Sequence, residues 1–201
     1  MPEEKKLMPV TLSAVAVFCG SRFGNNPLYR QAAQKTGQVL AEQGIRLIYG
    51  GGAHGLMGVV ADAALTAGGA VTGVIPDFLE TREKMHEGVA ELIVVDSMHA
   101  RKQIMFARAD AFWILPGGFG TFDEMMEILT WKQLGQHGKP IILVNVEHWA
   151  DHVIAMLDAA VAQGFAEPVS RAMIHTVPDI ETALAFSQPQ IAQQKVPAGQ
   201  L

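Results

Sequence analysis

Short runs of Val, Ile and Leu without polar alternation constrain this chain more than any other feature of its sequence. A strand that is apolar on both faces needs cover on both faces, as strands have in a parallel sheet. Helical patterns lie between most of these runs, and right-handed crossovers follow by default. We therefore expect an α/β fold, a Rossmann-like doubly wound parallel sheet with helices on both faces. The runs are Ala14–Phe18, Arg46–Tyr49, Val71–Ile75, Leu92–Val95, Ala111–Leu115 and Ile141–Val144.

The segments between the runs repeat apolar residues at helical spacing. Two stripes are clearest, one within 32–40 and one within 56–64, and Gly44 and Gly68 are placed to end these helices. Further helices are predicted at Met98–Arg108, Thr121–Leu134, Ala150–Gly164 and Ile180–Ala192.

A length of 201 residues fits a single domain with one core. We place this domain at residues 1–187, because the composition turns to Gln, Pro and Gly after Ser187, and we expect 188–201 to be a mobile tail. Cys19 is the only cysteine of the sequence, so an intramolecular disulfide is excluded. We expect Cys19 to be a buried small residue rather than a nucleophile.

Charge and hydropathy exclude some partners. The net charge is −5 and the Lys and Arg residues are scattered, so we expect no nucleic-acid partner. The apolar run near the N-terminus is too short for a signal-peptide core or a membrane span, so we expect a cytoplasmic protein without a membrane partner.

Glycine-rich segments follow three of the predicted strands. In a doubly wound sheet, ligands bind where the carboxyl ends of strands meet helix N-termini, so these exits are candidate sites. They are Cys19-Gly20-Ser21, Gly50-Gly51-Gly52-Ala53-His54-Gly55 and Pro116-Gly117-Gly118-Phe119-Gly120-Thr121.

The third exit is the most specific of these sites. Its glycines allow a ligand to approach the backbone, and Thr121 opens a helix whose free N–H groups can receive a phosphate. An acid follows at Glu124, but Thr121-x-x-Glu124 is also the pattern of a capping box. Spacing alone leaves both roles of Glu124 open.

Two other segments add to this site. The second exit lacks both the G-x-G-x-x-G spacing and the Lys-Ser or Lys-Thr of a P-loop, so it either supplies backbone N–H groups or allows close helix packing. The segment Met98-His99-Ala100-Arg101-Lys102 begins a helix with two cations, which are unfavourable there without an anion. Adjacent cations cannot share one helix face, so at most one of them is expected to point at a ligand.

Together, these residues resemble the LOG (LONELY GUY) family of cytokinin riboside 5′-monophosphate phosphoribohydrolases. The family pattern P-G-G-x-G-T-x-x-E is matched at every fixed position from Pro116 to Glu124, and Arg101-Lys102 accompanies it. Supporting matches are Cys19-Gly20-Ser21, Gly50-Gly51-Gly52, Gly55-Leu56-Met57-Gly58 and Thr130-Trp131, and the similarity runs from about Val15 to Phe165.

The resemblance implies a homodimeric enzyme with active sites near the subunit interface. It would hydrolyse the N-glycosidic bond of N6-substituted AMP or of AMP, releasing the free base and ribose 5-phosphate, without a cofactor or metal. It assigns Arg101 and Glu124 as the catalytic pair. It assigns substrate contacts to Glu83, Lys102, Gly117, Gly118, Phe119, Gly120, Thr121, Phe122, Asp123 and Thr130, and to Ser21, Gly51, Gly52 and Met98 from the supporting segments.

Three positions depart from the family pattern. The residues around Glu83 read Glu80-Thr81-Arg82-Glu83-Lys84 where the family has Met-Pro-Arg-Glu. Phe119 replaces a common tyrosine and Asp123 a common glutamate, so hydrogen bonding near the phosphate or the interface can differ.

The chemistry suits the assigned groups. Positive charge builds on the ribose as the base leaves, so the Glu124 carboxylate can stabilise that charge or activate the attacking water. Arg101 can orient the ribose or the phosphate, or favour the ionised form of Glu124. An N6 substituent needs an apolar pocket, for which Met57, Met98 and Phe106 are candidates.

Three alternatives compete with this hypothesis. A non-catalytic nucleotide or molybdenum-cofactor carrier can use the same fold and glycine turn. A lysine decarboxylase would need pyridoxal phosphate and a Schiff-base lysine, for which Lys102 is the only neighbour of the site. His148 and His152 lie four apart on a predicted helix, but no third metal ligand is apparent.

Overall fold

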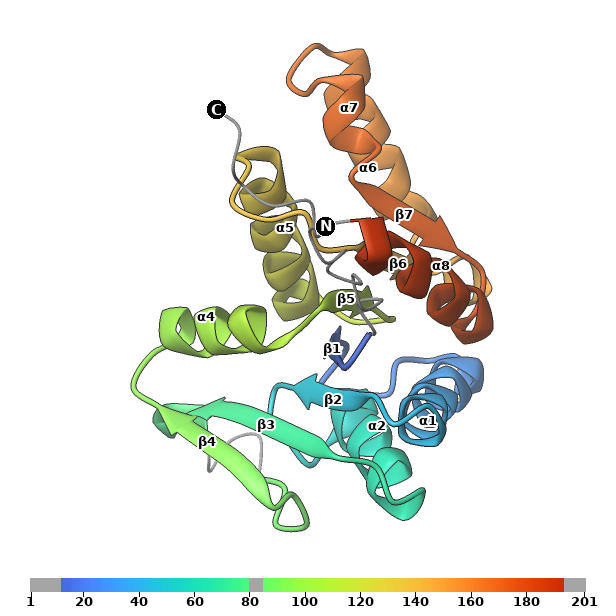
Figure 1. Cartoon of the computed structure of the whole chain (residues 1–201). Helices are drawn as coiled ribbons and strands as arrows, with labels where there is room; N and C mark the ends of the chain where they lie inside the picture. Colours follow the sequence, from blue (N-terminus) through green and yellow to red (C-terminus); the bar gives the residue numbers. More distant parts are fainter. Residues whose placement is uncertain (1–11, 80–84, 194–201) are drawn as a thin grey trace, which may run out of the picture.

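The computed structural model describes residues 12–79 and 85–193 of the chain. Seven strands form one sheet in the order β4-β3-β2-β1-β5-β6-β7, and every neighbouring pair is parallel (Figure 1). The doubly wound sheet expected from the apolar runs is therefore confirmed. The strands are β1 (Ala14–Phe18), β2 (Arg46–Tyr49), β3 (Val71–Pro76), β4 (Glu91–Val95), β5 (Ala111–Ile114), β6 (Ile141–Val144) and β7 (Ile174–Val177).

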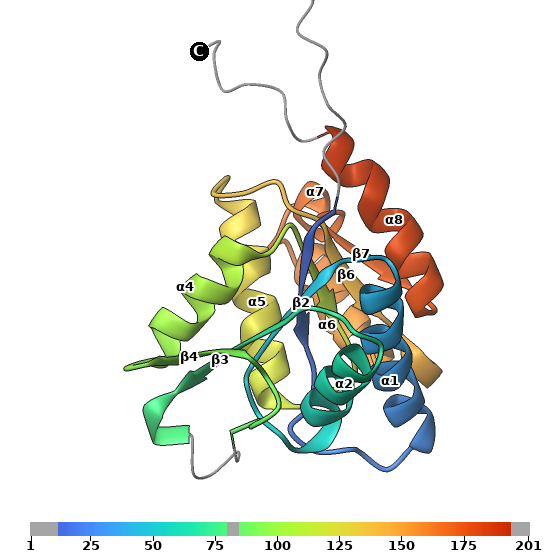
Figure 2. The ribbon, with the colours of Figure 1, turned by 60° about the horizontal axis from the view of Figure 1, so that its bottom comes forward.

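Helices cover both faces of the sheet. Buried residues of α1, α2 and α8 pack with one face, and those of α4, α5 and α6 pack with the other (Figure 2). The elements are α1 (Pro27–Glu42), α2 (Gly55–Thr66), η1 (Asp77–Leu79), α4 (Met98–Arg108), α5 (Phe119–Gln133), η2 (Val146–His148), α6 (Asp151–Ala162), α7 (Pro168–Arg171) and α8 (Ile180–Gln193).

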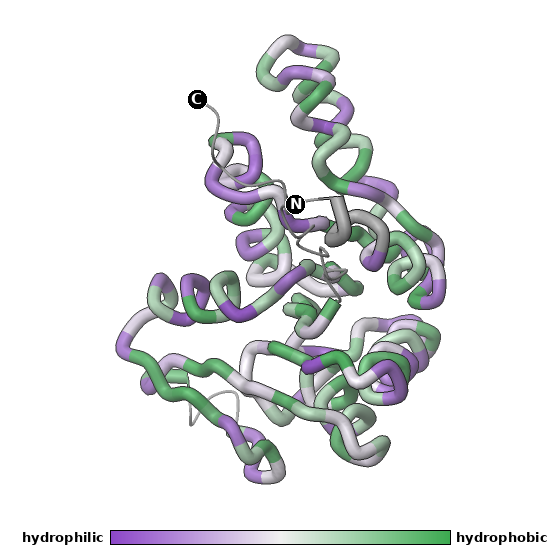
Figure 3. The backbone as a smooth tube through the Cα atoms, in the orientation of Figure 1, coloured by the Kyte–Doolittle hydropathy of each residue, from purple (hydrophilic) through white to green (hydrophobic). Residues whose placement is uncertain are grey.

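The strands are apolar because alternate residues enter two different cores. Val15 and Val17 of β1 pack beneath α1 and α2, whereas Ala16 and Phe18 face α4 and α5. Figure 3 shows the hydrophobic colour along the strands and its alternation with hydrophilic residues along α4 and α5. Both cores are needed to cover the sheet, so the layers act as one unit.

The C-terminal part differs from the sequence-based prediction. Strand β7 was not among the predicted strands, and α7 was not predicted. The helix predicted at Ile180–Ala192 is confirmed as α8, which runs to Gln193. Residues 188–193, expected in a tail, are therefore helical, and 194–201 lie outside the described residues. Ser187 is fully buried and accepts a hydrogen bond of 2.9 Å from the indole N–H of Trp113, which anchors α8 to the sheet.

Candidate active site

A cleft of about 910 Å³ opens at the carboxyl ends of the central strands. It lies where the strand order reverses, because β1 pairs with β2 on one side and with β5 on the other. The Gly20 N–H donates to the Pro116 carbonyl at 3.0 Å, which ties the exit of β1 to the exit of β5. The first and third glycine-rich segments therefore form adjoining walls of one cleft.

The third segment forms a tight loop before α5. A Cβ on Gly117 would overlap Oγ1 of Thr121 and lie 2.6 Å from its Cβ, so only glycine fits beneath that side chain. The helix begins at Phe119 with Gly118 as its N-cap, and this glycine has no side chain to cap it. The N–H groups of the first helical turn therefore face the loop without a side-chain cap, as in an anion-binding helix terminus.

The position at which α5 begins is incompatible with a capping box formed by Thr121 and Glu124. A capping box requires Thr121 at the N-cap, but Thr121 is already inside the helix, two residues beyond its first residue. The Phe122 N–H donates to the Gly118 carbonyl at 3.0 Å, as the helix requires. The capping-box role of Glu124 is therefore wrong, because α5 begins earlier than the sequence suggested.

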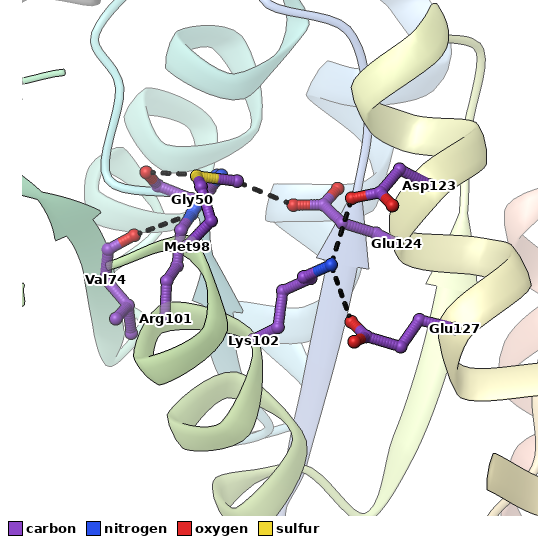
Figure 4. Close-up of polar contacts among 8 residues, drawn as sticks. All are labelled: Gly50, Val74, Met98, Arg101, Lys102, Asp123, Glu124 and Glu127. Carbon is purple, nitrogen blue, oxygen red and sulfur yellow. Dashed lines mark hydrogen bonds and ion pairs between the residues drawn. The ribbon is translucent and has the colours of Figure 1, made fainter.

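Arg101 and Glu124 meet at the floor of the cleft (Figure 4). Arg101 Nη1 lies 3.5 Å from Glu124 Oε1, and the two side chains are only 7% and 9% exposed. The guanidinium also donates through Nε to the Val74 carbonyl at 3.1 Å and through Nη2 to the Gly50 carbonyl at 3.4 Å. These bonds fix the plane of the guanidinium and hold one cation against one carboxylate in a largely buried site.

Lys102 points toward α5 and has carboxylate partners there. Its Nζ lies 2.9 Å from Glu127 Oε2 and 3.1 Å from Asp123 Oδ2 (Figure 4). Burial alone would lower the pKa of Lys102, but the hydrogen bonds to Glu127 and Asp123 outweigh burial and raise that pKa above its usual value. The expectation that adjacent cations diverge is therefore met: Arg101 lines the cleft, whereas Lys102 bridges α4 to α5.

The second glycine-rich segment packs the start of α2 against the exit of β1 and makes room for Arg101. The N–H groups of Leu56 and Met57, at the start of α2, donate to the Gly20 carbonyl at 2.9 and 3.3 Å. A Cβ on Gly50 would overlap Nη2 of Arg101, so this glycine makes room for the guanidinium. Gly51 has a φ of +79°, which favours glycine.

An aromatic pair supports α5 beside the cleft. Trp149, which lines the cleft, stacks on Phe122 with ring centroids 5.8 Å apart and planes 14° from parallel. The turn before Trp149 is strained, with φ of +48° at Glu147 and +61° at His148. Asn145 closes this turn by accepting from the Ala150 N–H at 2.7 Å.

The predicted substrate contacts fall into three groups. Some line the cleft together with Arg101 and Glu124: Ser21, Met98, Gly117, Gly118, Phe119, Gly120 and Thr121. Others lie outside its lining: Gly51, Gly52, Lys102, Phe122, Asp123 and Thr130. Thr130 is exposed and donates to the Met126 carbonyl at 2.7 Å. Glu83 lies outside the described residues.

Sequence reasoning missed several residues of the cleft. Arg22, Phe23 and Tyr29 follow the first glycine-rich segment, whereas Trp149 comes from a distant loop. The only sequence signal for Arg22, Phe23 and Tyr29 was their position just after a predicted strand exit, and Trp149 had none. Of the apolar residues expected near an N6 substituent, Met57 and Met98 line the cleft. Phe106 does not, because its ring packs against Phe112 and Trp131.

Cys19 and the histidine pair have structural explanations. Burial, followed by the charge of Glu124, raises the pKa of the Cys19 thiol far above its usual value, so the thiol stays protonated at neutral pH. His148 belongs to η2 and precedes α6, so the prediction of His148 and His152 on one helix was wrong. Among residues 12–79 and 85–193, no group of three or more His, Cys, Asp or Glu side chains is arranged to hold a metal ion.

Within residues 12–79 and 85–193, every helix is too short or too polar to span a bilayer.

Sequence comparison connects the chain to proteins of known activity. The family described as possible lysine decarboxylase matches residues 57–186. The cytokinin riboside 5′-monophosphate phosphoribohydrolase LOG2 of Arabidopsis thaliana is 42% identical over 183 residues, which are 91% of this chain and 84% of that protein. The cytokinin riboside 5′-monophosphate phosphoribohydrolase of Rhodococcoides fascians is 43% identical over 176 residues, which are 87% of this chain and 89% of that protein.

Solved structures share the fold at much lower identity. The molybdenum-cofactor carrier protein of Chlamydomonas reinhardtii has a TM-score of 0.68 and 22% identity, covering 90% of this chain and 99% of that chain. The molybdenum-cofactor binding protein of Rippkaea orientalis has a TM-score of 0.66 and 21% identity, covering 87% and 94%. At such identity, the likeness establishes the fold alone.

Proposed function

The chain belongs to the LOG family, the family described as possible lysine decarboxylase that contains the cytokinin riboside 5′-monophosphate phosphoribohydrolases, and from this premise we propose its reaction. We propose that it hydrolyses the N-glycosidic bond of N6-substituted AMP, of AMP, or of both. The products are the free base and ribose 5-phosphate. The bond from C1′ to the base nitrogen breaks, the hydroxyl of water goes to C1′, and the proton goes to the base.

One observation supports this reaction above the others. The Arg101–Glu124 pair, with 3.5 Å between Nη1 and Oε1, lies in the same cleft as the glycine loop at the start of α5. A nucleoside monophosphate presents a phosphate and a reacting sugar carbon in one small molecule, and the cleft offers an anion site and a carboxylate side by side.

In this mechanism the phosphate anchors the substrate. The loop from Gly117 to Thr121 and the first turn of α5 would receive the 5′-phosphate, and binding energy at this remote group would hold the ribose against Glu124. Glu124 would stabilise the positive charge that develops on the ribose or activate the water. Arg101 would hold Glu124 in place, since the Val74 and Gly50 carbonyls fix its guanidinium.

The other substrate contacts rest either on position in the cleft or on the family resemblance. Ser21, Met98 and the residues of the glycine loop line the cleft, so their contact with substrate is supported by position. Contact by Glu83, Lys102, Gly51, Gly52, Phe122, Asp123 and Thr130 is proposed from the family resemblance alone.

A lysine decarboxylase, as the family is described, would bind pyridoxal phosphate through a Schiff base. A Schiff base forms on an unprotonated lysine amine. Among the described residues that line the cleft there is no lysine. Lys102 is the nearest by sequence, and Glu127 and Asp123 keep it protonated. The residues do not fit this cofactor, and an absorbance spectrum of the purified protein without an aldimine band is the expected result.

A cofactor carrier is the second candidate, because the molybdenum-cofactor carrier proteins share the fold. A carrier has no need of a buried carboxylate beside an arginine at its anion site, so the Arg101–Glu124 pair favours the enzyme.

Assembly and location follow from the resemblance. We propose a homodimer with active sites near the interface, in the cytoplasm. Light scattering on the purified chain should give twice the monomer mass, and a monomer would contradict this proposal.

Product analysis tests the reaction. The protein is incubated with AMP, N6-isopentenyl-AMP, adenosine and N6-isopentenyladenosine, and the products are separated by chromatography. We expect free base and ribose 5-phosphate from the nucleotides and much slower release from the nucleosides. Nucleotide binding without release of base would contradict the enzyme and support the carrier. Equal cleavage of nucleosides would contradict the anchoring role of the glycine loop.

A further inference from the structure

The proposed substrate brings more negative charge into the cleft than the helix terminus can balance. A phosphate monoester carries between one and two negative charges at neutral pH, whereas a helix N-terminus offers about half a positive charge. The cleft already contains the carboxylate of Glu124. A cation close to the glycine loop would therefore strengthen phosphate binding.

The cleft offers two arginines for this role. Among the described residues that line it, the Lys and Arg side chains are those of Arg22 and Arg101. The guanidinium of Arg101 is buried and faces Glu124, and it also donates to two backbone carbonyls. Its charge is already balanced within the protein, which leaves Arg22.

The backbone of Arg22 is fixed beside the glycine loop. A Cβ on Gly20 would lie 2.9 Å from the Arg22 carbonyl oxygen and 3.4 Å from Cα of Gly117, so the two segments meet at this glycine. On the other side, a Cβ on Gly55 would overlap the Arg22 nitrogen. The Leu56 N–H bonds to the Gly20 carbonyl and holds this crossing together.

The side chain of Arg22, in contrast, is exposed to the solvent of the cleft. Within residues 12–79 and 85–193, no hydrogen bond or ion pair of this side chain is present. The ring of its neighbour Phe23 makes a cation–π contact with Arg30, whose guanidinium lies 5.3 Å from the ring centroid, so this ring does not engage Arg22. Arg22 thus combines a rigid attachment point beside the glycine loop with an uncommitted charge at its end.

We propose that Arg22 binds the 5′-phosphate and makes this site select nucleotides over nucleosides. The proposal deepens the proposed function and rests on it for the identity of the substrate. Its phosphate-binding step does not depend on hydrolysis, because ribose 5-phosphate has no base to release. Arg22 is a specificity residue in this scheme, and Glu124 performs the chemistry.

Binding of ribose 5-phosphate by calorimetry tests the proposal without turnover. Replacing Arg22 by Gln should weaken binding at least about tenfold, as expected for loss of a charged hydrogen bond. Arg22→Lys should recover part of the affinity, because a cation remains. Lys35→Gln is the control with the same change in charge; Lys35 pairs with Glu181 on the outer surface and is expected to bind like the wild type.

Kinetics then separate selectivity from general damage. Arg22→Gln should lower kcat/KM for AMP at least about tenfold and leave kcat/KM for adenosine unchanged, because adenosine has no phosphate. Wild-type affinity of Arg22→Gln for ribose 5-phosphate would overturn the proposal, and so would an equal loss with AMP and adenosine. If the wild type releases no base from any nucleotide, the proposed hydrolysis fails, but the calorimetric comparison still decides the role of Arg22.

Discussion

Replacing Glu124 by Gln removes one charge from the candidate site and little else. The amide keeps the length of the side chain and one acceptor oxygen. In the wild type, Glu124 Oε1 lies 3.5 Å from Arg101 Nη1 in a site where the two side chains are 9% and 7% exposed. The substitution therefore tests whether the carboxylate performs chemistry or only stabilises the fold.

The geometry of the Arg101–Glu124 pair determines how much stability Glu124→Gln should lose. At 3.5 Å and an effective dielectric constant of about 20, the pair attracts with about 4 to 5 kcal/mol, and desolvation of both groups offsets most of this. Arg101 keeps its bonds to the Val74 and Gly50 carbonyls. We expect the free energy of unfolding to fall by about 1 to 3 kcal/mol, from a total of about 5 to 15 kcal/mol. The variant should stay folded.

The catalytic effect should be larger. Loss of a group that stabilises a developing charge or moves a proton typically costs about 10²- to 10⁴-fold in rate, which is about 3 to 5.5 kcal/mol of barrier. Release of adenine from AMP should therefore fall by that factor in Glu124→Gln, while AMP binding by calorimetry stays close to wild type.

Glu127→Gln is the matched control. Glu127 lies one turn further along α5, is 22% exposed and pairs with Lys102 at 2.9 Å, so the same charge is lost outside the cleft. Base release by this variant should stay within a few-fold of wild type. A catalytic role of Glu124 is refuted if folded Glu124→Gln releases adenine within about tenfold of the wild-type rate, or if the two variants lose activity equally.

Three further perturbations probe the loop, the last helix and a buried histidine. Gly117→Ala places a Cβ against Thr121 and should lower the free energy of unfolding by about 1 to 3 kcal/mol and weaken AMP binding, as measured by urea unfolding and calorimetry. Asp179→Ala removes the acceptor of the Thr182 N–H, a bond of 2.8 Å at the start of α8, and should cost about 1 kcal/mol in urea unfolding. Burial lowers the pKa of His137 below 6.5, so its neutral form is favoured in the folded state. The neutral side chain of His137 therefore stabilises the fold fully above the unfolded pKa of about 6.5, and this stabilisation is lost as pH falls below that value. Urea unfolding of His137→Gln should accordingly show a smaller loss of stability than the wild type between about pH 7.5 and about pH 5.5.

Each of these predictions has a control. Gly118→Ala should leave stability nearly unchanged, because no described atom lies within 4 Å of its added Cβ, and equal damage at both glycines would contradict the steric account. Asp179→Asn keeps a capping oxygen and should retain most of the stability that Asp179→Ala loses. Burial also lowers the pKa of His175, so the pH dependence should shrink but not vanish in His137→Gln; an unchanged slope would contradict the role of His137.

The sheet was predictable wherever strands are buried on both faces. β6 is fully buried, and its continuous apolar run appears in the sequence with the correct bounds. β7 lies at the sheet edge, where only Ile174 and Val177 are buried and His175 and Thr176 interrupt the pattern. The helix at Ile180–Ala192 was predicted from its spacing, but its anchor to the sheet was not, because that anchor is a bond between Trp113 and Ser187, 74 positions apart, which no local pattern encodes.

The candidate site was predictable where one segment carries the signal. The glycines, Thr121 and Glu124 follow one another in the chain, so their proximity follows from the strand-to-helix turn. Which of Arg101 and Lys102 faces the cleft depends on the rotation of α4 against the sheet, which spacing does not reveal. Arg22 and Trp149 enter the cleft from loops, and loops carry no periodic pattern from which their direction can be read.

The glycine-rich exits look alike in sequence, yet they differ in a way that limits the ligand. At the second exit, the N–H groups of Leu56 and Met57 are already bonded to the Gly20 carbonyl, and Gly50 has no side chain because Arg101 occupies that space. At the third exit, the first N–H groups of α5 donate to no backbone carbonyl of the described residues. One helix terminus is thus occupied within the protein, and the other is available to an anion. The 5′-phosphate of the proposed substrate therefore fits the start of α5 and not the start of α2.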